Sequence, residues 1–234
     1  MMKAKILNIE TSTRICSVSL AYGDEIVAAR ERENTFEHAK ILHPFIQDVM
    51  DVAHWSPSDL NAVAVSEGPG SYTGLRIGVS AAKGLCFALN IPLIAVSTLK
   101  AMALHAAEEL NYQDVFYVPM IDARRMEVYS AVFDNQGRLF KKVDAEIIGT
   151  QSFEEFYQKK QSIYFGDGAL KCQSVFEPVR SMRYHKGGFP SARFMNQLAQ
   201  DKFVQKDFQD VAYFEPFYLK DFVAAKPKVK GLNM

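Results

Sequence analysis

The chain has 234 residues, and its 27 Lys and Arg balance 27 Asp and Glu to a formal net charge of +0. This length allows one domain or two lobes with a substantial core. The balanced charge argues against a protein that grips nucleic acid on its own. Three scattered cysteines without a C-x-x-C pair predict reduced thiols in a cytosolic protein. The N-terminus is too polar for a signal peptide and no apolar run is long enough to span a bilayer, so we expect no membrane association.

The first half of the chain predicts the order βββ-α-β-α-β-α. Short apolar or alternating runs indicate strands at residues 4–10, 15–22, 25–32, from 63 and at 92–96. Apolar residues at helical spacing predict helices at 37–53, 73–89 and from 98 to about 110. Pro44 should kink the first of these or mark where its regular part begins. Thr73 is the expected cap of the second.

The second half restarts the same pattern with fewer helices. We expect strands at 115–122, 127–133, 139–148 and 162–165, and helices at 153–160 and 191–202. In both halves an apolar strand ends in an acid, Glu10 or Asp122, and a returning apolar strand follows a short polar turn. This weak similarity at long period predicts a duplicated lobe. We therefore divide the chain into lobes at 1–111 and 112–234, and expect the aromatic segment from Lys206 to pack on the body as far as about Phe222.

The glycine-rich stretch from Gly68 to Gly78 is the most informative part of the chain. A buried strand leads into Gly68-Pro69-Gly70, and a helix follows that carries Gly74 and Gly78 on one stripe with Ala81 and Leu85. Each interior glycine costs a helix about 1 kcal/mol relative to Ala, so something should approach closely there. Three partners are possible: a phosphate, the protein's own sheet, or another helix. The spacing matches neither G-x-G-x-x-G nor a P-loop.

Other polar residues leave open alternatives. Glu10 and Asp122 could face one cleft and hold a metal–nucleotide complex or act as acid and base, or each could cap its own turn. Arg76 could be a member of a buried ion pair or contact an anion. His38 and His43 are five apart, about 140° around a helix, so we expect no metal site from them. The lysines near the C-terminus are expected to belong to a solvated tail.

Three segments together resemble the bacterial TsaB family, also called YeaZ. They are Ile9-Glu10-Thr11-Ser12, the run from Gly68 to Gly78, and Ile121-Asp122-Ala123-Arg124-Arg125 with Glu127-Val128-Tyr129. The order, spacing and total length fit, and the glycine segment is the specific match. The likeness covers the first lobe well and the second loosely. It implies an α/β, actin-like and RNase H-like fold of two lobes, the second reduced.

The resemblance also implies a function. TsaB proteins support the related enzyme TsaD, with the ATPase TsaE, in making threonylcarbamoyl-adenosine beside the anticodon of tRNA. We therefore expect a non-catalytic, cytoplasmic accessory subunit without a cofactor, which forms a homodimer when alone and meets tRNA only through the complex. The alternatives are an actin-like small-molecule kinase or ATPase and, less favoured, a glycoprotease-like metallopeptidase. The five-residue spacing of His38 and His43 argues against the metallopeptidase, and the absence of a phosphate-binding loop argues against the kinase or ATPase.

The resemblance places the partner contact on the first two helices. The residues expected at this interface are Gly74, Gly78, Ala81, Leu85, Leu42, Ile46 and Val49. If Gly78 faces outward, Gly78→Glu should block association and leave the isolated protein folded. A residual nucleotide or anion site would involve Glu10, Thr11, Ser12, Gly70, Ser71 and Asp122.

Overall fold

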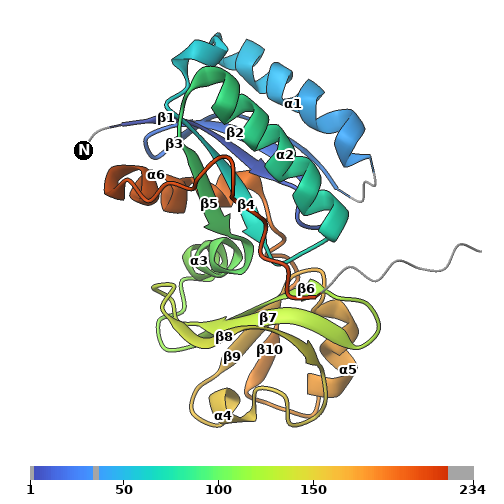
Figure 1. The fold of residues 1–234 in the computed structure, drawn as a ribbon. Helices are drawn as coiled ribbons and strands as arrows, with labels where there is room; N and C mark the ends of the chain where they lie inside the picture. Colours follow the sequence, from blue (N-terminus) through green and yellow to red (C-terminus); the bar gives the residue numbers. More distant parts are fainter. Residues whose placement is uncertain (1–2, 34–36, 221–234) are drawn as a thin grey trace, which may run out of the picture.

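A computed structural model describes residues 3–33 and 37–220 of the chain. Two lobes lie one above the other, each built on a five-stranded sheet, and helix α3 (Thr98–Leu110) lies between them (Figure 1). In the described part of the chain, no helix combines the length and the apolar character that crossing a membrane requires.

The first sheet has the strand order β3-β2-β1-β4-β5. β1 pairs antiparallel with β2 and parallel with β4. All five strands begin within one residue of the expected positions. β1 and β4 are buried almost throughout; the apolar run of β4 predicts this, whereas β1 also buries Asn8 and Glu10. The bounds are β1 (Lys5–Glu10), β2 (Cys16–Tyr22), β3 (Glu25–Arg32), β4 (Ala62–Gly68) and β5 (Leu93–Ser97).

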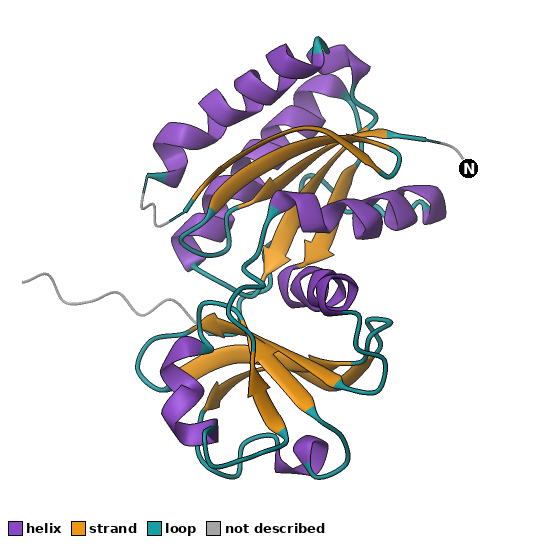
Figure 2. Ribbon diagram, turned by 180° about the vertical axis from the view of Figure 1, so that it is seen from behind, coloured by secondary structure: helices purple, strands orange, loops and turns teal. Residues whose placement is uncertain are grey.

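Helices cover both faces of the first sheet (Figures 1 and 2). On one face α1 (His38–Ala53) and α2 (Tyr72–Leu89) pack their apolar stripes on the strands, with the turn η1 (Pro57–Asp59) between α1 and β4. On the other face lie η3 (Ala192–Met195) and α6 (Asn196–Gln205). α1 runs on through Pro44, which therefore does not mark its beginning.

The second sheet repeats the pairing pattern of the first. Its order is β10-β9-β6-β7-β8, in which β6 pairs antiparallel with β7 and parallel with β9. β6 and β9 thus correspond to β1 and β4, which confirms the duplication. The bounds are β6 (Phe116–Asp122), β7 (Glu127–Phe133), β8 (Leu139–Ile147), β9 (Ser162–Phe165) and β10 (Met182–Tyr184).

The second lobe is poorer in helix than the first, as expected. The helix predicted at 153–160 contracts to α4 (Glu154–Tyr157), and the chain after β9 forms only η2 (Leu170–Cys172) and α5 (Gln173–Phe176). The apolar face of α3 packs on this sheet through buried residues such as Leu99 and Met102. η2, α5 and β10 were not predicted, because three or four residues carry no measurable periodicity.

Residues 191–220 return to the first lobe, so the expected division of the chain at 111 and 112 does not hold for them. α6 packs on β1 and β5. Residues 206–220, called the C-terminal strap below, then cross the first lobe beside α2 (Figure 1). The N–H of Gln209 donates to the carbonyl of Leu93, and that of Phe217 donates to the carbonyl of Glu67 at 2.7 Å. Phe222 and the lysine-containing end of the chain lie outside the described residues.

Candidate functional site

The glycines of α2 pack against the turn that follows β1. A Cβ atom on Gly74 would lie 2.1 Å from the carbonyl oxygen of Thr11, and one on Gly78 would lie 2.2 Å from Thr11 Oγ1. The Thr11 hydroxyl is held there, because it donates to the carbonyl of Gly74 at 2.8 Å. Both glycines are buried by the protein's own chain. The expectation that they face outward to meet a partner helix is therefore wrong.

The loop before α2 closes on the same turn. The N–H of Ser71 donates to the carbonyl of Ser12 at 2.6 Å, and a Cβ on Gly70 would lie 2.2 Å from that carbonyl oxygen. Ser71, rather than Thr73, caps α2, since its hydroxyl accepts from the N–H of Gly74 at 3.3 Å. An anion at a helix N-terminus needs such N–H groups for itself. The geometry therefore favours a structural contact between this loop and the turn after β1 over an anion-binding site.

Glu10, the acid at the end of β1, is buried and organises its own turn. Its carboxylate accepts from the N–H of Ser12 at 2.6 Å and from the hydroxyl of Ser66 at 3.0 Å. Burial raises the pKa of Glu10, and the hydrogen bonds from Ser12 and Ser66 oppose that rise. This is the turn-capping role that the sequence left open as the alternative to chemistry.

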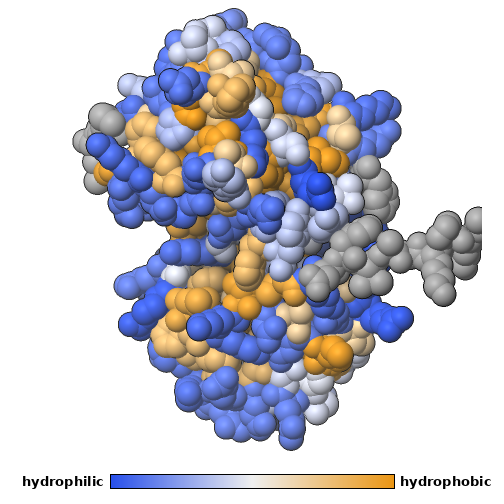
Figure 3. Space-filling model, in the orientation of Figure 1, coloured by the Kyte–Doolittle hydropathy of each residue, from blue (hydrophilic) through white to orange (hydrophobic). Residues whose placement is uncertain are grey.

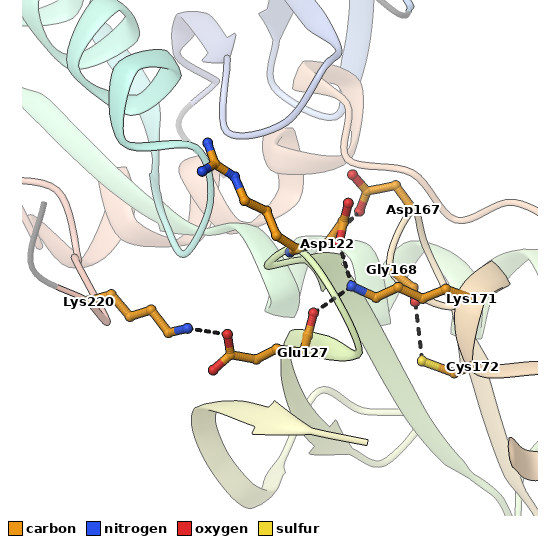
Figure 4. Close-up of polar contacts among 8 residues, drawn as sticks. Asp122, Glu127, Asp167, Gly168, Lys171, Cys172 and Lys220 are labelled. Atoms are coloured by element: carbon orange, nitrogen blue, oxygen red, sulfur yellow. Dashed lines mark hydrogen bonds and ion pairs between the residues drawn. The ribbon is translucent and has the colours of Figure 1, made fainter. Parts of the chain in front are cut away.

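Asp122, the equivalent acid of the second lobe, is exposed instead of buried. It accepts from the N–H of Arg124 at 2.9 Å and forms an ion pair with Lys171 (Figure 4). The Lys171 ammonium also donates to the carbonyl of Glu127 at 2.6 Å, and the Glu127 carboxylate pairs with Lys220 of the C-terminal strap. Asp122 thus caps its turn and has its charge balanced within the chain.

A third acid, Asp167, belongs to this cluster and was missed in the sequence. It stands between Gly166 and Gly168, directly after β9, and its carboxylate accepts from the N–H of Asp122 at 3.1 Å. Burial raises the pKa of Asp167 to about 6, and the nearby charge of Asp122 adds to the rise. A Cβ on Gly168 would lie 2.8 Å from the carbonyl carbon of Ile121. The available signal was a Gly-x-Gly after a short strand, at the position that Gly68-Pro69-Gly70 takes in the first lobe.

α1 and α2 form an open groove on the surface of the first lobe. The cavity measures about 600 Å³, and apolar or small side chains dominate its lining. In Figure 3, hydrophobic residues gather on the upper lobe, where α1 and α2 lie in Figure 1. The lining residues are Ala39, His43, Tyr72, Thr73, Arg76, Ile77, Ser80, Ala81, Gly84 and Leu85.

The groove differs from the expected interface in its residues. Of the expected stripe, only Ala81 and Leu85 line it. Leu42, Ile46 and Val49 are buried against the sheet, so they belong to the core and their assignment to an exposed interface is wrong. Gly84 was missed: a Cβ there would meet nothing within 4 Å, and the backbone of α2 is open to approach.

The two histidines of α1 point apart, as their spacing predicts. His38 is buried with its Nε2 atom 3.3 Å from the carbonyl oxygen of Ile15, whereas His43 is exposed and lines the groove. Across residues 3–33 and 37–220, no group of three or more His, Cys, Asp or Glu side chains could hold a metal ion.

These features define a class of protein: a duplicated α/β fold of two lobes in the actin-like arrangement. The family model of TsaD, tRNA N6-adenosine threonylcarbamoyltransferase, matches residues 32–164. The chain is 32% identical over 227 residues to the tRNA threonylcarbamoyladenosine biosynthesis protein TsaB of Escherichia coli, covering 95% of this chain and 97% of that protein. It is 29% identical to the TsaB protein of Haemophilus influenzae, covering 97% and 98% of the two chains.

A solved structure agrees with these sequence relationships. YeaZ from Pseudomonas aeruginosa superposes with a TM-score of 0.78 at 27% identity, over 92% of this chain and 100% of that one. The chain therefore belongs to the TsaB (YeaZ) family.

Proposed function

We propose that this protein acts in the biosynthesis of threonylcarbamoyl-adenosine in tRNA, as a non-catalytic partner of a TsaD-like enzyme. The relatives named for this pathway span nearly the whole chain, which supports the pathway. The observation that carries the partner role is the groove between α1 and α2. It lies between the two helices to which the resemblance assigns the contact with TsaD, or with a second copy when the protein is alone.

The groove has the properties of a docking surface for a helix. Ile77, Ala81 and Leu85 form a stripe at the spacing of helix packing, beside the bare backbone of Gly84. Small residues allow the axes of two helices to approach closely. A partner seated there would remove this apolar stripe from water, which stabilises a complex.

The hydrogen bonds and ion pairs of the two strand-end acids, Glu10 and Asp122, support a non-catalytic role. Glu10 is buried in hydrogen bonds to its own turn, and Asp122 is neutralised by Lys171. Both carboxylates are thus engaged by groups of the protein's own fold, whereas acid–base or metal chemistry uses an acid that can reach a substrate or a metal ion. A cytoplasmic location, a TsaE-like ATPase as a further partner and a purely indirect contact with tRNA complete the proposal.

Two glycine substitutions test the groove directly. Gly84 and Gly149 both have open space where a Cβ atom would stand, but only Gly84 lies in the groove. Gly84→Glu should leave the protein folded and abolish co-purification with the TsaD-like enzyme, because docking would bury an unpaired charge. Threonylcarbamoyl-adenosine in cellular tRNA should fall with it. Gly149→Glu, in the second lobe, is the matched control and should change neither.

The non-catalytic part of the proposal has its own test. The purified protein should neither hydrolyse ATP nor cleave peptides above background. Turnover that disappears in Glu10→Ala or Asp122→Ala protein would contradict it and favour an actin-like kinase or ATPase. If Gly84→Glu protein stays folded and still supports tRNA modification, the partner does not dock in this groove.

A further inference from the structure

A second, polar cavity lies on the other side of the exposed ridge of α2. It measures about 380 Å³ and is bounded by α2 and the C-terminal strap. α2 contributes Arg76 and Lys83, and the strap contributes Glu215, Tyr218 and Lys220. Three cations thus face one acid. This composition contrasts with the apolar groove on the α1 side of the same helix.

The guanidinium of Arg76 is held in position without a direct ion pair among the described residues, although the charge of Glu215 acts on it. It donates to the hydroxyl of Tyr72 at 2.6 Å and lies 5.4 Å from the centre of that ring. Within the described chain, no carboxylate oxygen lies within 4.0 Å of it. A guanidinium has five N–H groups in a planar fork, so several remain available to an oxyanion. The alternative of a buried ion pair, which the sequence left open for Arg76, is not what the structure shows.

Lys83 is the second cation of the cavity that has no ion pair among the described residues. Its ammonium donates to the carbonyls of Ala212 and Phe214 at 3.0 and 3.1 Å, which fixes the strap beside α2. These acceptors are neutral, and none of the ion pairs among the described residues includes Lys83. Its third N–H remains for another acceptor. Lys220, in contrast, is already paired with Glu127.

The shape of the cavity indicates what kind of anion fits. Arg76 and Lys83 lie seven residues apart, about two turns along one helix. The rings of Tyr72 and Tyr218 form a wall beside them, with centres 4.8 Å apart. Guanidinium forks bind phosphate oxygens in a bidentate manner. The volume exceeds that of a phosphate group alone and reaches the range of pockets for small organic ligands.

We propose that this cavity binds a phosphate ester through Arg76 and Lys83, with the remainder of the ligand against the Tyr72 and Tyr218 rings. The phosphate comes either from a free nucleotide or from the backbone of an RNA. The cavity shares Tyr72, Arg76 and Ser80 with the apolar groove, whereas Lys83 and the strap residues line this cavity and not the groove. The proposed binding does not rest on a partner docking in that groove. Glu215 of the strap also lines the cavity, and its charge acts on Arg76.

Calorimetric titration of the full chain with pyrophosphate at low ionic strength tests the site. We expect saturable binding that Arg76→Gln weakens about tenfold or more, the loss of a charge-assisted hydrogen-bonded contact. Lys83→Gln should also weaken it. Lys159→Gln is the matched control: it removes one exposed positive charge from the second lobe just after α4, and should change the affinity less than about twofold.

Further measurements separate the possible ligands and outcomes. Arg76→Lys keeps the charge but loses the fork, so it should restore only part of the affinity. Displacement of pyrophosphate by ATP identifies a nucleotide site, and displacement by an RNA stem-loop identifies a backbone site. Absent binding, an affinity that Arg76→Gln does not change, or pyrophosphate binding that neither competitor displaces would overturn the proposal. Co-purification of the Lys83→Gln variant with the TsaD-like enzyme reports separately on the groove, because Lys83 lines the polar cavity and not the groove.

Discussion

The two lobes share one strand order but close the turn after their first strand in different ways. In the first lobe the turn is buried. Glu10 is inaccessible to solvent, and Thr11 and Ser12 contact the glycines of the loop and of α2. In the second lobe the turn is open, with Asp122 in solvent and paired to Lys171. Gly166 and Gly168 still make the close approach from the loop after β9, but only short helices follow.

The same duplicated strand order thus carries a long surface helix in the first lobe and a polar network in the second. In the first lobe, the 18-residue helix α2 is held against the turn through its buried glycines, and its exposed face lines two cavities. Where the helix is missing, the same edge of the sheet carries a network of acids and lysines (Figure 4). The proposed docking surface of the first lobe therefore belongs to a helix that the contacts of Gly74 and Gly78 with Thr11 hold in place.

Substitutions at Gly78 and Gly84 should separate the inner and outer faces of α2 most strongly. Gly78→Glu should lower the free energy of unfolding by about 3–5 kcal/mol, because the side chain overlaps Thr11 and buries a charge without a partner. Gly84→Glu should unfold at nearly the same urea concentration as the wild type. A Gly78→Glu protein of normal stability would show that α2 packs less tightly against Thr11 than these contacts indicate.

The two loop glycines compare the tightness of the two turns. Gly70→Ala places a methyl group 2.2 Å from the carbonyl oxygen of Ser12, and Gly168→Ala places one 2.8 Å from the carbonyl carbon of Ile121. Overpacking against backbone costs about 1–3 kcal/mol. We expect Gly70→Ala near the upper end and Gly168→Ala near the lower end in chemical denaturation. The reverse order would make the second lobe the tighter one.

Asp167 should give the open lobe a stability that depends on pH. Its pKa rises from 3.8 to about 6 on folding, so the folded state holds this proton more tightly. That contribution is fully present below pH 3.8 and is lost as the pH rises through about 6. Asp167→Asn should therefore stabilise the protein by about 1–3 kcal/mol above pH 7. Thermal unfolding of both proteins across the pH range should show the difference vanish towards pH 4; a constant difference would contradict the assignment.

The smallest expected effect compares alanine at two helical glycines. Gly84→Ala should raise the unfolding free energy by about 1 kcal/mol, because helix propensity improves and the methyl group meets only open space. Gly78→Ala should lower it, since its methyl group collides with Thr11 Oγ1. Two changes of the same chemistry in one helix should thus have opposite signs in urea unfolding.

Much of the fold could be predicted from the chain itself. Unbroken or alternating apolar runs located β1, β4, β7 and β9, and the matching ends at Glu10 and Asp122 pointed to the duplication. The short elements after Phe165 could not be predicted, because their stability comes from packing and not from periodicity. The destination of the C-terminal strap was also hidden, since aromatic composition predicts packing without indicating on which surface. Of these rings, Phe214 and Tyr218 are half-buried, whereas Phe208, Tyr213 and Phe217 are exposed, so the expected packing holds only in part.

The glycines of α2 mark the limit of what sequence alone determines about this protein. Their presence in a helix required a close neighbour, and the apolar spacing correctly identified which helix bears an apolar surface. Only the tertiary structure decided that Thr11 is the neighbour of Gly74 and Gly78, and that the open backbone belongs to Gly84. The physical reason is that helical spacing defines which residues share a face, whereas the direction of that face depends on how far the helix is rotated against the sheet. That rotation is set by contacts with residues more than sixty positions away.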